Sequence, residues 1–267
     1  MMNFALRRGL GVVVLMVASV AMVLWRPSGA YASGWLLFAL MIALTVFNAR
    51  KKLPFLPLLS SEAWLQFHIY AGLFSAAVFL VHIGWRMPHG WFQGTLTTLY
   101  VLVMLSGIVG LVWSRTFPKR LTTRGGEVLY ERIPAIRRAL QEQAEALALP
   151  PVAEARSVIL AEFYAENLAG FFDGAHNFWR HLLESRAPLN ELLARTGNLS
   201  RYLSDSERST MEKIAALARQ KDGLDYQYAL QATLKGWLFV HIPLTYSLLL
   251  VSIVHIVLVY AFSGGAL

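Results

Sequence analysis

The sequence predicts an all-α fold, an integral membrane helical bundle with a helical cytoplasmic insertion. The first observation behind this prediction is composition, because 56% of the 267 residues are hydrophobic and only 15% are charged. Soluble domains carry about 25% charged residues, so the composition excludes an isolated soluble enzyme. The second observation is length, because windows of about 20 residues, which a bilayer core requires, give five apolar spans. These spans are roughly Leu10–Trp25, Trp35–Ala49, Trp64–Trp85, Leu96–Trp113 and Trp237–Phe262.

The third observation is the placement of tryptophan. Seven of the eight tryptophans lie at or near the ends of the spans, namely Trp25, Trp35, Trp64, Trp85, Trp91, Trp113 and Trp237. Tryptophan is enriched where its ring sits at headgroup level, so this pattern favours membrane spans over a buried soluble core. The chain has no cysteine, which excludes disulfides, c-type haem attachment and clusters or zinc sites held by thiolates.

Charge next to the spans predicts the orientation. The net charge is +8, but residues 117–233 hold 15 basic and 15 acidic residues, so the excess belongs to the apolar part of the chain and does not predict a nucleic-acid partner. One side carries most of the flanking basic residues, namely Arg7, Arg8, Arg50, Lys51, Lys52, Arg115, Lys119, Arg120 and Lys235. By the positive-inside rule this side is cytoplasmic. We therefore expect a multi-pass protein of the inner membrane of a bacterium, with its amino terminus and residues 117–233 cytoplasmic and its carboxyl terminus outside.

The predicted spans and their orientation divide the chain into four segments. Residues 1–34 form the first transmembrane helix and an outer loop, residues 35–116 form helices two to four, residues 117–233 form the insertion, and residues 234–267 form helix five. The start of the chain also resembles a cleaved signal peptide, because a basic pair and an apolar run precede the small-residue stretch Ala30–Ala32. Cleavage would leave the topology of the rest unchanged.

The insertion is predicted to be helical. Ser204 and Glu207 have the capping-box spacing ahead of the helical run MEKIAALARQ. Gly223 is expected to break that run, and a new helix is expected to begin near Asp225 and continue into the fifth span. The insertion has no glycine-rich phosphate loop and no alternation of strands and helices, so no nucleotide-binding domain is predicted.

Four histidines carry the functional information. His68 and His82 lie 14 residues apart in the third span, and His241 and His255 lie 14 residues apart in the fifth. Fourteen residues return a helix to within about 40° of its starting direction and advance it by about 21 Å, so each pair shares one helix face. His68 and His241 each lie four residues after a tryptophan at the start of a span, so the two parallel helices offer two facing imidazole pairs at matched depths.

Two facing imidazole pairs predict two bis-histidine haems of the b type. A lone buried histidine would more simply hydrogen-bond to a neighbouring helix, but two matched pairs are difficult to explain in that way. Zinc needs four ligands around one point, which pairs about 21 Å apart do not supply.

With this spacing the chain resembles the dihaem membrane cytochromes b, including the ferric-reductase-like haem-binding bundles. The resemblance rests on His68-x13-His82 and His241-x13-His255 and covers Trp35 to Phe262. It implies that His68 and His241 ligate one haem, and that His82 and His255 ligate the other. The flavin and nicotinamide domain of the ferric-reductase and oxidase branch is not found in this sequence. The Pro-Glu-Trp-Tyr run of the quinol:cytochrome c reductase branch is also missing, and that branch has no insertion of this size, so the resemblance assigns no branch.

Further residues could contribute to haem binding. Gly72, Gly107 and Gly110 would let a macrocycle lie close to a helix backbone, although small residues serve helix–helix contacts equally well. Arg86 and His89 on the outside, and Lys52, Lys119 and Lys235 on the inside, could pair with haem propionates or could serve only as topology charges. His176 and His181 in the insertion lack a helical metal spacing and are interpreted as surface or core residues. No catalytic residue is predicted.

Iron held by two histidines has no open position for a substrate, so its expected role is one-electron transfer. The sequence predicts an electron-transfer subunit, rather than a complete enzyme, that passes electrons between the quinone pool and a redox partner. Quinone, membrane lipid and other redox protein subunits are the expected partners, and the insertion is a candidate docking surface. Two alternatives remain: a stand-alone metal reductase driven by quinol or another reductant, and a histidine-bearing membrane transporter or sensor without haem.

Overall fold

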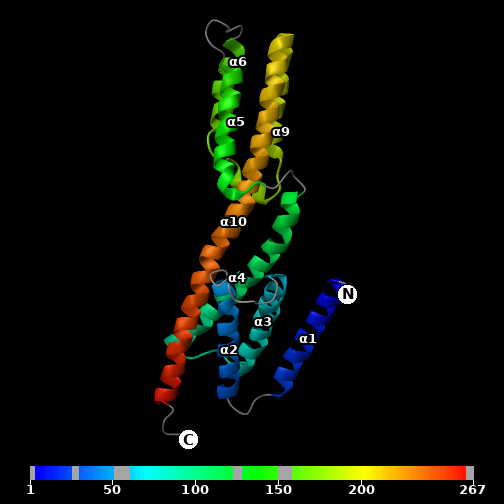
Figure 1. Ribbon diagram of the computed structural model, residues 1–267. Helices are drawn as coiled ribbons and strands as arrows, with labels where there is room; N and C mark the ends of the chain where they lie inside the picture. Colours follow the sequence, from blue (N-terminus) through cyan, green and yellow to red (C-terminus); the bar gives the residue numbers. More distant parts are fainter. Residues whose placement is uncertain (1–3, 26–29, 51–60, 123–127, 150–157, 263–267) are drawn as a thin grey trace. The chain divides into compact units, whose positions relative to one another are not determined.

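The computed structural model describes residues 4–25, 30–50, 61–122, 128–149 and 158–262, and within these residues it is all-helical, without a strand. Figure 1 shows the elements in chain order. The chain divides into two compact units. The first unit combines Met1–Val112 with Trp237–Leu267, and the second is Trp113–Gly236, within which the predicted insertion lies.

The first unit is built from α1 (Phe4–Trp25), α2 (Ala30–Arg50), α3 (Ser61–His82) and parts of the long helices α4 (Trp91–Thr122) and α10 (Asp205–Phe262). Helix α3 packs against both α1 and α2. Apolar side chains from these helices form one core, namely Met22, Leu37, Met41, Val78, Tyr100 and Leu248.

Three of the helices, α3 from Glu62 to His82, α4 and α10, are long and apolar enough to cross a membrane. The two preceding helices carry shorter apolar stretches, Gly11–Leu24 in α1 and Ala30–Val46 in α2. Each of the five predicted spans therefore falls on an apolar helix, and three fall on helices with the length and composition of a membrane span.

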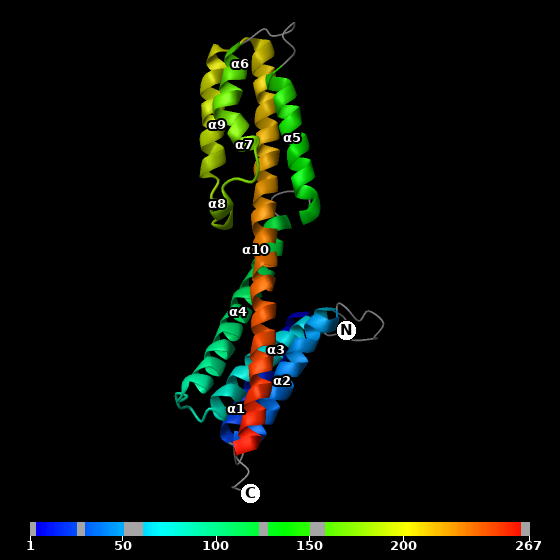
Figure 2. The same cartoon turned by 90° about the vertical axis from the view of Figure 1, so that its left-hand side faces the viewer.

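The second unit packs short helices against the first part of α10 (Figure 2). The short elements are η1 (Tyr130–Arg132), α5 (Ile133–Ala148), α6 (Val158–Phe163), the π-turn η2 (Tyr164–Leu168), α7 (Ala169–Phe172), α8 (Phe178–Leu182), α9 (Ala187–Leu199) and η3 (Ser200–Tyr202). Helix α5 illustrates the pattern, because Leu140, Ala144 and Ala148 recur at helical spacing and are buried. They join Leu168, Phe172 and Ile214 in the core of this unit. The prediction of a helical insertion is confirmed.

The predicted break at Gly223 is wrong, because α10 runs without interruption from Asp205 to Phe262. Glycine in a helix interior costs only about 1 kcal/mol relative to alanine. Burial of its neighbours outweighs this cost, since Lys221, Leu224 and Tyr226 are all buried in the second unit. Tertiary packing therefore keeps the helix intact across the glycine.

The predicted capping box at the start of α10 is confirmed. The backbone N–H of Ser204 donates to the Glu207 carboxylate at 2.8 Å, and the N–H of Glu207 donates to Ser204 Oγ at 3.4 Å. Two N–H groups that the helix itself cannot satisfy thus gain partners.

Ser204→Ala is expected to weaken the first turn of α10 by about 1 kcal/mol, because it removes the acceptor for the Glu207 N–H. Hydrogen exchange of the amides of residues 205–208 should accelerate about fivefold, the rate equivalent of that free energy. Ser206→Ala, an exposed substitution in the same turn, is the control. Equal exchange in the two variants would contradict a stabilising cap.

Candidate functional site

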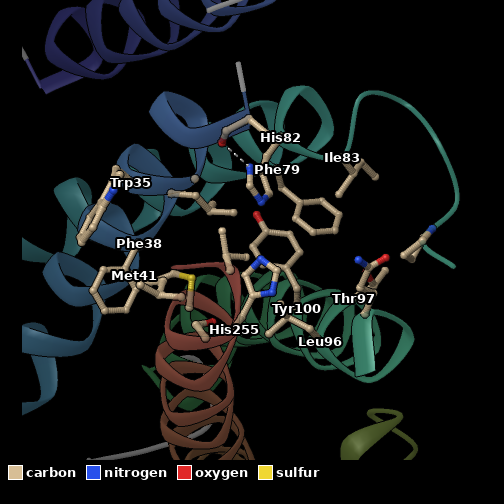
Figure 3. A pocket seen from close by; sticks show the side chains of 18 of the residues that line it. Trp35, Phe38, Met41, Phe79, His82, Ile83, Leu96, Thr97, Tyr100 and His255 are labelled. Carbon is tan, nitrogen blue, oxygen red and sulfur yellow. Dashed lines mark hydrogen bonds between the residues drawn. The ribbon is translucent and has the colours of Figure 1, made fainter. Parts of the chain in front are cut away.

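His82 and His255 face one another in the first unit. His82 is the last residue of α3, and His255 lies in α10. Their ring centres are 6.4 Å apart and their planes are nearly perpendicular, at 88° (Figure 3). The structure therefore brings together the two histidines that the sequence predicted as one ligand pair.

The spacing of this pair suits a metal held between two imidazoles. A metal lies about 2.0–2.1 Å from each imidazole nitrogen, so two opposite rings have their centres on the order of 6 Å apart. The 6.4 Å separation of the His82 and His255 ring centres is close to that value.

Hydrogen bonds orient His82. Its Nδ1 lies 3.1 Å from the Ala30 carbonyl oxygen and 3.3 Å from Ser33 Oγ. When Nδ1 donates to the carbonyl, Nε2 keeps the lone pair that a metal requires. Gly34 allows α2 to come this close, because a Cβ there would lie 2.9 Å from His82 Cε1. Ser33 and Gly34 were not predicted from the sequence, where they are simply two small residues directly before Trp35.

A cavity of about 530 Å³ lies beside this pair. Figure 3 shows aromatic side chains around it, among them Trp35, Phe38, Phe79 and Tyr100. Arg86 and His89, from the segment between α3 and α4, also line it. The volume falls within the 300–1,000 Å³ typical of cofactor sites, which are mostly apolar with a few polar groups. Both outer residues predicted to meet propionates thus border the same cavity as the histidine pair.

His68 of α3 and His241 of α10, the second predicted pair, both belong to the first unit. Ser106 of α4 organises the surroundings of His241, because its Oγ lies 3.2 Å from His241 Nδ1. Trp237 donates from Nε1 to the Ser106 carbonyl at 2.9 Å and stacks on the His241 ring, with centres 5.2 Å apart. As at His82, the hydrogen bond engages Nδ1 and leaves Nε2 for a ligand. The role of Ser106 could not be predicted from the sequence, because it is one of several serines on apolar helices.

The three predicted glycines differ in their surroundings. A Cβ on Gly72 would meet nothing within 4 Å, so α3 is open there. A Cβ on Gly107 would lie 3.8 Å from His241 Cε1. A Cβ on Gly110 would lie only 1.9 Å from Cζ2 of Trp237, so the indole fills the space beside that glycine.

The predicted inner lysines lie as follows. Lys235 belongs to the second unit, where its ammonium donates to Glu131 at 2.6 Å and lies 3.9 Å from the centre of the Tyr130 ring. This hydrogen bond lowers the pKa of the Glu131 carboxyl. Lys119 is exposed near the end of α4, and Lys52 lies outside the described residues.

His176 and His181 also lie in the second unit, beside Lys221 and Asp222 respectively. Among the described residues, no three histidine or acidic side chains form a group that could hold a metal ion, so the candidate ligands occur as pairs.

Comparisons of the chain with models of protein families, with curated proteins and with solved structures find no match. The functional assignment therefore depends on the geometry of the two histidine pairs and their surroundings.

Proposed function

We propose that this protein is a membrane-embedded electron-transfer subunit that binds two b-type haems, each between two histidines. The observation that carries the proposal is the pair formed by His82 and His255, whose ring centres lie 6.4 Å apart beside a largely apolar cavity. The hydrogen bonds at His82 Nδ1 and His241 Nδ1 support it, because both leave Nε2 available.

The exterior of the first unit supports a membrane-spanning bundle. Large apolar side chains are exposed along its helices, including Val13, Val17, Val20, Leu24, Leu105, Val112, Phe239, Leu250, Val257 and Phe262. So many exposed apolar side chains would be unfavourable in water and are expected where helices face lipid. In this proposal the basic flanks place the amino terminus and the second unit on the cytoplasmic side of a bacterial inner membrane.

The residues around the outer pair have distinct roles. His82 and His255 would hold one haem, and the Ala30 carbonyl and Ser33 would fix the His82 ring. Arg86 and His89 would offer positive charge and a hydrogen bond to the carboxylates of the macrocycle, and the aromatic lining would exclude water. Bis-histidine iron supplies one-electron transfer without an open coordination position.

The second pair would extend the electron path. His68 and His241 would hold a second haem one helix segment away, about 21 Å along the axes of α3 and α10. We propose that quinone and a redox protein partner supply and accept the electrons.

His82→Ala is expected to halve the haem content, because it removes one ligand of one pair and leaves His68 and His241 unchanged. Purified protein should carry two b-type haems per chain by pyridine haemochrome, and the variant should carry one. His176→Gln, a histidine of the second unit outside both pairs, should keep both. Full haem content in His82→Ala would refute the ligand assignment, and wild-type protein without haem would favour a histidine-bearing transporter or sensor.

A further inference from the structure

A short segment of the second unit, residues 178–186, exposes two large apolar side chains. Trp179 is 76% exposed and Leu183 is 82% exposed. They lie one helical turn apart on the same side, because the backbone N–H of Leu183 donates to the Trp179 carbonyl at 3.1 Å. His181, between them in sequence, points inward and is only 2% exposed. The segment therefore presents a small apolar surface although its opposite side is well packed.

The segment has a defined conformation. Asn177 and Glu184, at or near its two ends, have positive φ values of 57° and 59°, which non-glycine residues adopt only when their surroundings hold them there. Exposed Arg180 and Arg186 lie beside the apolar pair. An exposed tryptophan with flanking arginines is the composition found at a lipid headgroup layer.

The segment is attached to the end of α4. Arg120 Nη2 donates to the Leu182 carbonyl at 2.9 Å, and Arg120 Nε forms an ion pair with Glu184. Arg120 follows Trp113 by seven residues, so this attachment lies about 10 Å along the helix from the tryptophan at the end of the fourth apolar span. These contacts attach the segment that carries Trp179 and Leu183 to the part of α4 that follows its apolar span.

We propose that residues 178–186 form an interfacial anchor in which Trp179 and Leu183 enter the headgroup layer of the bilayer crossed by α4, while Arg180 and Arg186 bind anionic lipid phosphates. The inference depends on the proposed membrane crossing of α4. Two apolar side chains are too few for a stable protein–protein interface, which needs about 800 Å² and 20–30 residues on each partner. A few aromatic and basic side chains suffice for a lipid surface, because the spanning helices already hold the segment there.

The absence of cysteine makes a direct test possible. Trp179→Cys in the full chain is labelled with an environment-sensitive nitrobenzoxadiazole dye and placed in nanodiscs that contain anionic phosphatidylglycerol and lipids spin-labelled at the headgroup. The label is expected to be quenched at least about twofold more than the same label on Tyr202→Cys. Tyr202 is a matched control, because it is an aromatic residue with 79% exposure. It lies beside the start of α10, and about 45 Å of helix separates Asp205 from Lys235.

Val109→Cys, on the apolar and partly exposed surface of α4, reports the membrane crossing itself and is read with lipids spin-labelled along the acyl chain. Quenching at 109 without quenching at 179 would overturn the anchor and leave the proposed membrane bundle standing. No quenching at 109 would overturn both. Equal quenching at 179 in anionic and in neutral phosphatidylcholine nanodiscs would overturn the role of the two arginines.

Discussion

Asp225→Asn is expected to lower the free energy of unfolding of the second unit by about 3–5 kcal/mol, the range observed when one partner of a buried ion pair is removed. Asp225 is 2% exposed and lies between two cations. Its Oδ1 is 3.0 Å from Arg137 Nε, and its Oδ2 is 2.5 Å from Lys221 Nζ. The same Oδ2 accepts the backbone N–H of His176 at 3.1 Å.

The large effect follows from the charges that would remain. Lys221 is fully buried, so without the carboxylate its ammonium would keep His176 Nδ1 at 3.2 Å and the face of the Phe171 ring as close neighbours. An amide cannot neutralise two buried cations, although it can still accept hydrogen bonds. The second unit should therefore lose stability, while the first unit, which lacks these residues, should keep the haem content proposed for it.

Urea unfolding followed by hydrogen exchange of α5 and residues 205–236 measures this effect. Glu191→Gln is the matched control, because it makes the same acid-to-amide change in the exposed pair with Arg195 and should cost no more than about 0.5 kcal/mol. Adding Lys221→Met to Asp225→Asn should recover part of the loss, since it removes one of the two uncompensated charges. If Asp225→Asn and Glu191→Gln lowered the free energy of unfolding by similar amounts, the prediction would be wrong. That result would show that water reaches the buried cluster.

The features that the sequence predicted are those encoded locally. The capping box depends on Ser204 and Glu207 alone, and the histidine spacing depends only on helix geometry, so both could be recognised without knowledge of tertiary contacts. The fourth span was predicted to end at Trp113, but α4 continues to Thr122 and contains Pro118. Loss of hydropathy ends an apolar span but does not end a helix.

The features that the sequence did not predict depend on contacts distant in the chain. Phe117 packs against Tyr226 and Leu230, more than a hundred residues later, and this contact accompanies the continuation of α4. In the same way, Ser106 meets His241 from another helix, and the Ala30 carbonyl meets His82 across 52 residues. A periodic pattern identifies which face of a helix is apolar, but not which residue of another helix will lie against it.

The second large effect is expected at Gly110. Gly110→Ala would place a Cβ 1.9 Å from the Trp237 indole, well inside contact distance, so the ring must move or the two helices must separate. Overpacking of this kind costs about 1–3 kcal/mol. The displaced indole would lose its hydrogen bonds to the Ser106 carbonyl and Oγ, at 2.9 and 3.2 Å. Because the indole also stacks on His241, the change should affect the site proposed at His68 and His241 specifically.

Reduced-minus-oxidised spectra with a redox titration distinguish this outcome from general destabilisation. The haem proposed between His68 and His241 should be lost or shifted in potential, and the haem proposed between His82 and His255 should be unchanged. Gly94→Ala in the same helix is the matched control, because its Cβ would meet nothing within 4 Å and alanine favours the helix by about 1 kcal/mol. Combining Gly110→Ala with Trp237→Leu removes the opposing ring and should restore helix packing without restoring the hydrogen bonds to Ser106. If the double variant regained the wild-type potential, steric displacement alone would explain the effect of Gly110→Ala. If the potential remained shifted while stability recovered, the contacts of Trp237 with Ser106 and His241 would be what tunes the inner site.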